Sequence, residues 1–425
     1  MNGFAAFLAW PLALRLSLVA MSGLVAAALI NWAVYSLAYQ ARHWSPWSRH
    51  HVRDARSHFA DRVPLVGWLR LRRMAAAHGS PFWLRPLVIE IVCAAGFAAW
   101  YYWEAVLGGL LHPHVAPGII AANLDLAWSL HAGCLVHLVL FTFMLAASLI
   151  DADEWNIPDE VTVPGTLIGI ALSTMFPTAS LPAAFNRQFM AMPEPLDAAW
   201  PFNWPAGWAA GEPSGLVAAL AALGFWCFGL IVGGRWPLLR DTAHRYRLAA
   251  ALFLRRVLRD PWFPYVLGIA VAGSLTVAGV WSFAPLRWPA LLSALLGVAG
   301  GAATVWVVRV LGSWAFQKEA MGFGDVTLMA MIGAFVGWQP VLLIFFLAPA
   351  AAIVVYVPAM MIRRSHELPY GPYLCASTLG VVLFWGEVWN FAGPRFTVAW
   401  LIPVVLVGGF FMLGLCLAIL RKVRG

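Results

Sequence analysis

The sequence predicts an all-α fold, a polytopic bundle of about 8–11 transmembrane helices, and three observations lead to this prediction. Hydrophobic residues make up 62% of the 425 positions, and charged residues only 11%. The mean hydropathy of +0.78 indicates more apolar side chain than a soluble protein of this length can bury. Apolar runs of about 20 residues, each long enough to cross a bilayer as a helix, recur from end to end.

The apolar runs give the positions of the expected helices. The first run lacks the short hydrophobic core and cleavage site of a signal peptide, so it is expected to remain as a first helix. The runs 162–177 and 326–338 are short for a full crossing. The expected helices are 12–39, 86–110, 128–150, 162–177, 214–234, 263–284, 290–312, 326–338, 340–362, 372–390 and 396–420.

The basic residues are unevenly distributed, which predicts an orientation. If each run crosses once and the amino terminus lies outside, the cytoplasmic segments hold 22 of the 27 Lys and Arg residues. Cytoplasmic loops are the ones in which positive charge accumulates. The net charge of +8 therefore reflects topology, and a nucleic-acid partner is not expected. The cytoplasmic segments are 41–85, 151–161, 235–262, 313–325, 363–371 and 421–425.

Two segments combine acidic residues with an immediate membrane flank on the predicted inner side. They are "LIDADEWNIPDEVTVPG" at 149–165 and "MGFGDVTLMAMIGAFVGW" at 321–338. Asp151 ends one expected helix and Asp325 begins another, so the two carboxylates are predicted at the same depth. An ionisable side chain at the edge of the hydrocarbon region is a functional hypothesis by default. Two such carboxylates would share a proton and activate water against an amide.

Each segment also has a structural interpretation. Asp325 can be the N-cap of a helix that begins near Val326, where the helix dipole favours a carboxylate. Asp151 and its acidic neighbours can form a solvated turn closed by Pro158. Gly322 and Gly324 allow unusual backbone angles and a close approach of another chain to Asp325.

Taken together, the motifs resemble the prepilin peptidase family, the type IV prepilin leader peptidases among the GxGD membrane aspartyl proteases. The two acidic segments are similar to the two aspartate motifs of that family, and "LPYGPYLCAS" at 368–377 is similar to its Gly-Pro-Tyr-Leu stretch. The amino-terminal region resembles it more weakly, through "NWAVYSLAYQ" at 31–40, "VPLVGWLRLRR" at 63–73 and "FWLRPLVIEIV" at 82–92.

The resemblance implies the functional residues. The catalytic pair falls on Asp151 and Asp325, with Gly322 and Gly324 shaping the loop. Pro158 and Asp159 lie in the Ile-Pro-Asp element, where Asp159 is expected to position or cap, and is the alternative if Asp151 is not the acid. Glu90 matches a family position, and the sequence does not distinguish a role in the site from a role in packing.

The resemblance also implies the reaction, its partners and its place. The chain would be an aspartic endopeptidase that cuts the leader from type IV prepilins or type II secretion pseudopilins, at the cytoplasmic face of the bacterial inner membrane. Its partners would be these substrates and the lipid bilayer, and proteolysis would need no cofactor. Many relatives also methylate the new amino terminus with S-adenosylmethionine, and the sequence leaves that activity open.

Two departures from the family pattern are visible. The basic loop 41–85 lacks the paired C-x-x-C motifs that suit zinc, so no metal is predicted. The loop's histidines are interpreted as solvated side chains; they are His43, His50, His51, His58 and His78. The gap of 174 residues between Asp151 and Asp325 is longer than is usual in the family, and we assign the excess to an insertion.

The chain is therefore expected to have four parts. Residues 1–110 hold amino-terminal helices and the loop 41–85, 111–177 the first-aspartate segment, 178–262 the insertion, and 263–425 the second-aspartate segment. Within the insertion, 178–213 reads as an external loop. The stretch 235–260 is either a basic amphipathic helix on the inner leaflet or a solvated loop.

Two other functions remain open at this stage. A transporter or structural membrane protein would use the same aspartates to bind ions or protons. A degenerate relative would bind pilins without cutting them, although the presence of both aspartates argues against that.

Overall fold

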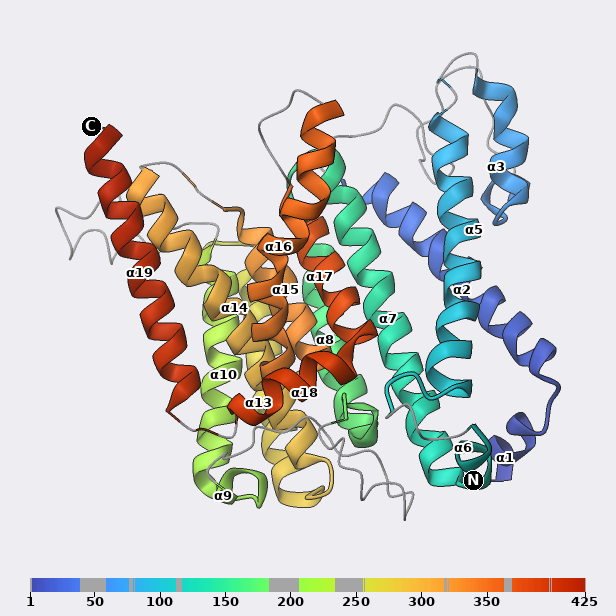
Figure 1. Cartoon of the computed structure of the whole chain (residues 1–425), viewed down its shortest axis with the longest axis horizontal. Helices are drawn as coiled ribbons and strands as arrows, with labels where there is room; N and C mark the ends of the chain where they lie inside the picture. Colours follow the sequence, from blue (N-terminus) through green and yellow to red (C-terminus); the bar gives the residue numbers. More distant parts are fainter. Residues whose placement is uncertain are drawn as a thin grey trace. The chain divides into compact units, whose positions relative to one another are not determined.

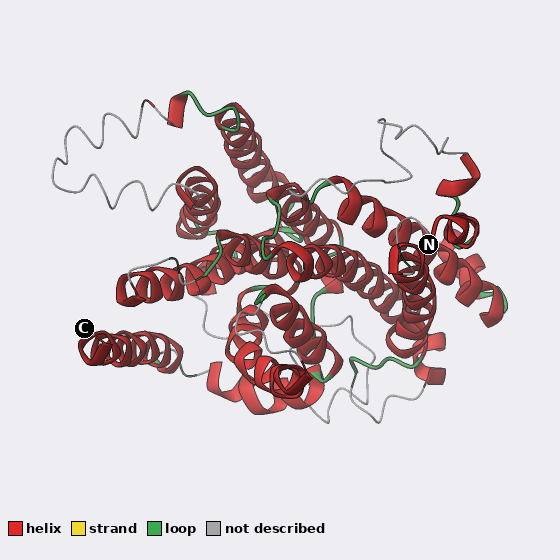
Figure 2. Cartoon of the chain, turned by 90° about the horizontal axis from the view of Figure 1, so that it is seen from above, coloured by secondary structure: helices red, strands yellow, loops and turns green. Residues whose placement is uncertain are grey.

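The computed structural model is built from helices and loops, and no strand occurs in the part of the chain that it describes (Figures 1 and 2). The all-α prediction is confirmed. The structure describes residues 2–38, 59–75, 79, 81–111, 117–182, 206–233, 255, 257–316, 319, 321–362, 369–396, 398 and 400–424.

The chain divides into two compact units. Unit 1 comprises Met1–Gly165, Leu181–Asp197 and Ala350–Val388, and unit 2 comprises Thr166–Ser180, Ala198–Pro349 and Trp389–Gly425. The helices of unit 1 are α1 (Asn2–Leu8), α2 (Leu12–Ser36), α3 (Val66–Leu71), α5 (Pro81–Tyr101), α6 (Pro117–Ala122), α7 (Leu124–Glu154) and α17 (Gly371–Leu383). The helices of unit 2 are α9 (Ala206–Ala209), α10 (Pro213–Val232), α13 (Phe263–Phe283), α14 (Trp288–Phe316), α15 (Phe323–Val336) and α19 (Leu401–Arg424).

Three further helices, α8 (Asp159–Met175), α16 (Trp338–Ile362) and α18 (Trp385–Phe396), contribute residues to both units. Four short turns complete the described chain: η1 (Phe59–Arg62), η2 (Arg72–Met74), the π-helical η3 (Tyr102–Val106) and η4 (Pro177–Ala179).

Six of the described helices are long and apolar enough to cross a membrane, so the protein is a multi-pass membrane protein. They are Leu12–Ser36, Phe82–Val106, Leu124–Glu154, Pro213–Val232, Phe263–Phe283 and Trp288–Phe316. The bent pair α17 and α18 would make a seventh, and three shorter apolar helices follow, at Phe323–Val336, Trp338–Val354 and Leu401–Cys416. Within the described residues, the full-length spans, the bent pair and the shorter apolar helices together are consistent with the predicted polytopic bundle.

One expected helix is wrong. The run 372–390 is not continuous: it breaks at Phe384 between α17 and α18, with a bend of 90°. Trp385 follows the break and is fully buried, and its indole N–H donates to the carbonyl oxygen of Pro182 at 2.8 Å within unit 1. A long-range contact of this kind leaves no mark in a hydropathy profile.

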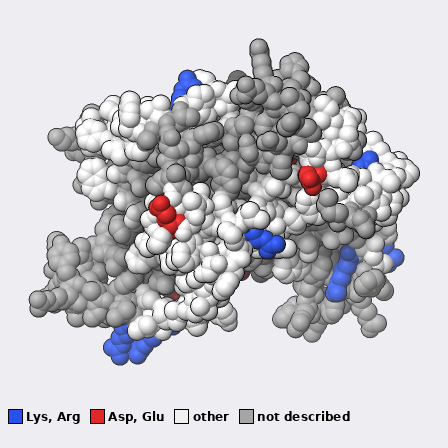
Figure 3. Space-filling model, turned by 90° about the horizontal axis from the view of Figure 1, so that it is seen from below, with Lys and Arg blue, Asp and Glu red and all other residues white. Residues whose placement is uncertain are grey.

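Several predicted segments lie partly or largely outside the described residues. They are about half of the basic loop 41–85, most of the external loop 178–213 and most of the basic stretch 235–260, together with the five histidines of the loop. On the face drawn in Figure 3, the described Lys, Arg, Asp and Glu side chains are few and set apart from one another.

The core of unit 1 is made by helices that pack closely. Helix α2 packs on α5 and α7, and α17 packs on α7. At Gly23 of α2 a Cβ atom would lie only 2.7 Å from the carbonyl oxygen of Cys93 in α5. Small residues permit such backbone contact between membrane helices, where van der Waals packing replaces the hydrophobic effect.

In unit 2, α14 and α15 lie side by side and touch through their glycines (Figure 1). A Cβ atom on Gly297 of α14 would lie 2.0 Å from the carbonyl oxygen of Gly333 in α15, and the reverse distance is the same. One turn along α14, a Cβ on Gly301 would lie 2.3 Å from the carbonyl oxygen of Met329. This small-xxx-small pair therefore fixes α15, the helix that begins with Asp325 in its first turn.

Substituting Gly297 by alanine is expected to destabilise unit 2, because the new methyl group overlaps the backbone of α15. Overpacking of this kind costs about 1–3 kcal/mol or more. The measurement is the midpoint of thermal unfolding in detergent. The matched control is Gly300→Ala on the same helix, where the nearest atom to a new Cβ is 3.8 Å away, an ordinary contact. Equal midpoints for the two variants would contradict the close contact.

Candidate active site

The first predicted aspartate lies in the last turn of α7. Asp151 is buried, with 5% of its surface exposed, and α7 ends three residues later at Glu154. Trp155 closes the helix in the left-handed conformation, with φ 60°. The chain therefore turns sharply just after Asp151, while the carboxylate itself points inward rather than into a solvated turn.

Asp151 is held by the start of α17. The backbone N–H of Gly371 donates to Oδ2 of Asp151 at 2.9 Å. A Cβ atom on Gly371 would lie 2.7 Å from that oxygen and 2.9 Å from Cδ1 of Ile157. Only glycine therefore allows the backbone to come this close. An exposed helix amino terminus is a natural binding place for a carboxylate.

The sequence did not assign a role to Gly371. The available signal was its place in the Gly-Pro-Tyr-Leu stretch at 368–377, which entered only through the resemblance. Pro372, in the first turn of α17, is typical of a helix start, where a missing N–H costs nothing.

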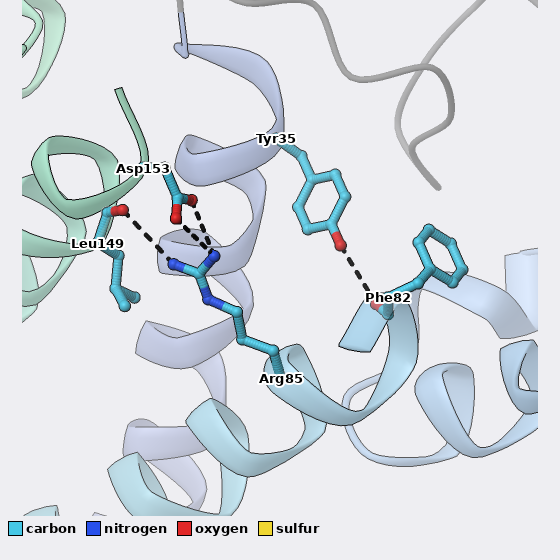
Figure 4. Close-up of polar contacts among 5 residues, drawn as sticks. All are labelled: Tyr35, Phe82, Arg85, Leu149 and Asp153. Carbon is cyan, nitrogen blue, oxygen red and sulfur yellow. Dashed lines mark hydrogen bonds and ion pairs between the residues drawn. The ribbon is translucent and has the colours of Figure 1, made fainter. Parts of the chain in front are cut away.

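The neighbouring acid, Asp153, is placed differently. Figure 4 shows the guanidinium group of Arg85 on α5 reaching the carboxylate of Asp153 on α7. The two distances are 2.8 Å, and a second nitrogen of Arg85 donates to the carbonyl oxygen of Leu149 at 3.5 Å. On the same side of the unit, the Tyr35 hydroxyl donates to the carbonyl oxygen of Phe82 at 3.3 Å. The ion pair joins α5 to α7. Because it is exposed to solvent, it contributes little to the free energy of unfolding.

Pro158 and Asp159 mark the start of α8. Pro158 is buried, and its carbonyl oxygen accepts the backbone N–H groups of Val161 at 3.0 Å and Thr162 at 3.4 Å. Asp159 is the first helical residue, half-buried in the first turn. The helix dipole favours a carboxylate at this place, and the positioning role of Asp159 stays a prediction.

The second predicted aspartate lies in the first turn of α15. Asp325 is buried, with 7% of its surface exposed. The helix begins at Phe323 and its N-cap is Gly322, so the interpretation of Asp325 as the N-cap is wrong. Helix α15 starts earlier than the apolar run suggests, because residues of its first turn are buried like those of the rest of the helix.

The two glycines of the motif have ordinary backbone angles. Gly322 has φ −63° and ψ 153°, and Gly324 is a buried helical residue, so the expected unusual angles are absent. At Gly322 a Cβ would meet only Oδ2 of Asp325 and the nitrogen of Gly324, at 3.8 and 3.9 Å. Gly322 is exposed and has no side chain, so it leaves space next to the carboxylate of Asp325. Thr327 closes the turn by donating to the carbonyl oxygen of Gly324 at 3.1 Å.

Glu90 is buried in unit 1 and binds the amino-terminal loop. Its carboxylate accepts the backbone N–H of Leu65, the indole N–H of Trp68 at 2.9 Å and the amide of Asn31 at 3.3 Å. Leu65 has φ 61°, a strained value for a branched residue. Through these bonds Glu90 holds residues 59–75 against α2 and α5.

Replacing Glu90 by leucine is expected to lower the free energy of unfolding by about 3 kcal/mol, because three donors would lose their acceptor in a buried place. Thermal unfolding in detergent would measure the loss. Glu160→Leu, at an exposed position of α8, is the control and should change the midpoint little. A wild-type midpoint for Glu90→Leu would mean that water replaces the carboxylate.

No group of three or more His, Cys, Asp and Glu side chains suited to a metal ion lies within the described residues. The cysteines Cys93, Cys134, Cys227 and Cys375 are buried and free, whereas Cys416 is exposed. The prediction that the chain holds no metal stays a prediction.

Comparison with known proteins shows which family part of the chain resembles. A model of the type IV leader peptidase family matches residues 262–357, which include Asp325 and its loop. The resemblance to this family is confirmed. The prepilin leader peptidase/N-methyltransferase of Aeromonas hydrophila is 35% identical over 117 residues. The protein of the same name from Pseudomonas aeruginosa is 32% identical over 117 residues.

Each of these matches covers 24% of this chain and 40% of the relative. The chain thus matches less than half the length of these curated relatives. No solved structure gives a significant match.

Proposed function

We propose that this chain is a membrane aspartyl endopeptidase that removes the leader peptide from type IV prepilins or type II secretion pseudopilins. Its catalytic pair would be Asp151 and Asp325. The observation that carries the proposal is the family match over residues 262–357, within which a buried aspartate begins a helix behind an uncovered glycine. The relatives named as prepilin leader peptidases support the substrate class.

In the proposed reaction the two carboxylates share one proton. The ionised carboxylate takes a proton from water, and the hydroxide equivalent attacks the carbonyl carbon of the scissile amide. The protonated carboxyl group hydrogen-bonds to the carbonyl oxygen and then gives its proton to the leaving amine. Gly371 would orient Asp151 through its N–H on Oδ2, which directs the remaining oxygen to the water.

The cleavage side is proposed from charge. In the expected topology the segments that carry both aspartates belong to the face that holds 22 of the 27 Lys and Arg residues, which is the cytoplasmic face of a bacterial inner membrane. A substrate with a basic leader in the cytosol and an apolar helix in lipid would present its scissile bond at that boundary.

Methylation of the new amino terminus is a second part of the proposal, since the relatives are also named N-methyltransferases. S-adenosylmethionine would supply the methyl group, and acidic side chains usually bind its amino and hydroxyl groups. Two buried carboxylates of unit 1 do not fit that task. Glu90 accepts three protein donors, and Glu104 contacts His137 at 2.8 Å and the indole of Trp100.

A second candidate function, transport of ions or protons, would use the same two aspartates, and one further pair of residues favours it. Glu104 and His137 form an ionisable pair, fully buried between helices of unit 1 that are expected to span the membrane. Ionisable pairs at such depth occur in proton pathways. A proton-flux assay in vesicles with and without a prepilin substrate would separate this function from proteolysis.

Co-expression of the full chain with a prepilin, followed by mass spectrometry of the pilin, tests the proposed function. We expect a pilin shortened by its leader, with the cut next to the apolar helix. A mass increase of one methyl group on the new amino terminus would establish the second activity in the same spectrum. An unprocessed prepilin in the presence of folded protein would refute the protease function.

A further inference from the structure

The end of helix α10 contacts the first turn of α15, which carries Asp325, although the two come from different parts of the sequence. The helix lies within the segment 178–262 that we assign to the insertion, and outside the family match at residues 262–357. It packs on α14 in unit 2. Its carboxyl end, capped by Gly233, therefore lies outside the residues that the family model matches.

Arg309 joins this end to the start of α15. Its guanidinium group is buried in α14, with 4% of the residue exposed. It donates to the carbonyl oxygen of Gly233 at 3.1 Å and to the carbonyl oxygen of Met321 at 2.9 Å. It also forms an ion pair with the carboxylate of Glu319. A buried arginine in an apolar helix is costly unless its donors are satisfied, and here three acceptors from two segments satisfy them.

Phe323, two residues before Asp325, is held from two sides. The guanidinium carbon of Arg309 lies 5.6 Å from the centre of its ring, within the range of a cation–π contact. A Cβ atom on Gly233 would lie 2.0 Å from the same ring. The ring thus rests against the end of α10, and only a glycine leaves it room.

We propose that the carboxyl end of α10, acting through Gly233 and Arg309, positions Met321 and Phe323 at the start of α15 and so sets the place of Asp325. Arg309 and Gly233 are positioning residues. They touch Met321 and Phe323 and not the reacting atoms. This gives the insertion a role in the proposed reaction, and the inference rests on the proposed function.

The proposal predicts a loss of turnover rather than of substrate binding. A displacement of about 1 Å at a catalytic group can cost about 100-fold in rate. We therefore expect Arg309→Met to lower kcat by about 10- to 100-fold, with KM changed less than about threefold. Arg309→Lys should be intermediate, because lysine keeps the charge but lacks the fork that reaches several acceptors. Gly233→Ala should behave like Arg309→Met, because the ring of Phe323 must move.

The experiment uses the full chain, purified in detergent and assayed with a synthetic prepilin peptide. The kcat is referred to the folded, monodisperse fraction. The matched controls are Arg287→Met, an exposed arginine just before α14, and Gly224→Ala on α10, where a new Cβ meets nothing within 4 Å. Both controls should keep wild-type kcat.

The outcomes separate the hypotheses. If Asp325→Asn is inactive while Arg309→Met and Gly233→Ala turn over like their controls, the positioning role is overturned and the proposed function stands. If Asp325→Asn still cleaves, the proposed function itself fails. If none of the Arg309 and Gly233 variants folds, or if kcat per folded molecule is unchanged in those that do, the contacts are structural only and the proposal is also overturned.

Discussion

Asp325→Asn is expected to abolish leader cleavage, with a fall in kcat of about 100- to 10,000-fold, the range found when a positioned acid or base is removed. Asparagine has nearly the shape of aspartate, so α15 and its contact with α14 should stay intact. It can neither take a proton from water nor return one to the leaving amine. The measurement is the rate of leader removal by the full chain, with the unfolding midpoint taken in parallel.

Asp151→Asn should give a loss of the same size, and the double variant should lose little more than either single one, because the two groups act as a unit. Asp153→Asn is the matched control. It lies two residues away on α7, and removing its exposed pair with Arg85 should cost no more than about 1 kcal/mol of stability and leave turnover unchanged. Retained cleavage by Asp151→Asn together with loss by Asp159→Asn would move the first acid to Asp159.

The positions of the helices that hold Asp151 and Asp325 were predictable from the sequence. The run at 128–150 is long, and the run at 326–338 is short but almost entirely apolar. The details of the helix ends were not predictable. The run at 326–338 suggested a helix from Val326, whereas α15 begins at Phe323. Its first turn contains Gly324, an unfavourable helical residue in isolation. Burial of that turn, together with the glycine contact between α14 and α15, outweighs the local propensity.

Other features depend on contacts between distant residues. At the break at Phe384, the indole N–H of Trp385 donates to the carbonyl oxygen of Pro182, and this bond between distant residues has no counterpart in the local sequence. The acceptors of Arg309 include the backbone carbonyl oxygens of Gly233 and Met321. Any residue type offers a carbonyl oxygen, so no pattern of side chains predicts those bonds.

In the candidate site, the contact of Gly371 is likewise not predictable from side chains. It depends on a backbone N–H group and on the absence of a Cβ atom. Gly371→Ala is expected to lower kcat by at least about tenfold. The new methyl group would meet Oδ2 of Asp151 at 2.7 Å and Cδ1 of Ile157 at 2.9 Å. Both distances are too short, so either the carboxylate or the start of α17 must move. Either change weakens the bond of 2.9 Å from the Gly371 N–H and displaces the acid from the scissile bond.

Gly380→Ala is the control for this prediction, because it lies on the same helix and a Cβ there meets nothing within 4 Å. Alanine also has the higher helix propensity, so Gly380→Ala should be as stable as the wild type or slightly more so, with unchanged kcat. A Gly371→Ala variant that folds and turns over like Gly380→Ala would mean that the N–H of Gly371 does not orient the catalytic acid. Because the substitution leaves both aspartates in place, its effect on kcat measures how sensitive cleavage is to the position of Asp151 alone.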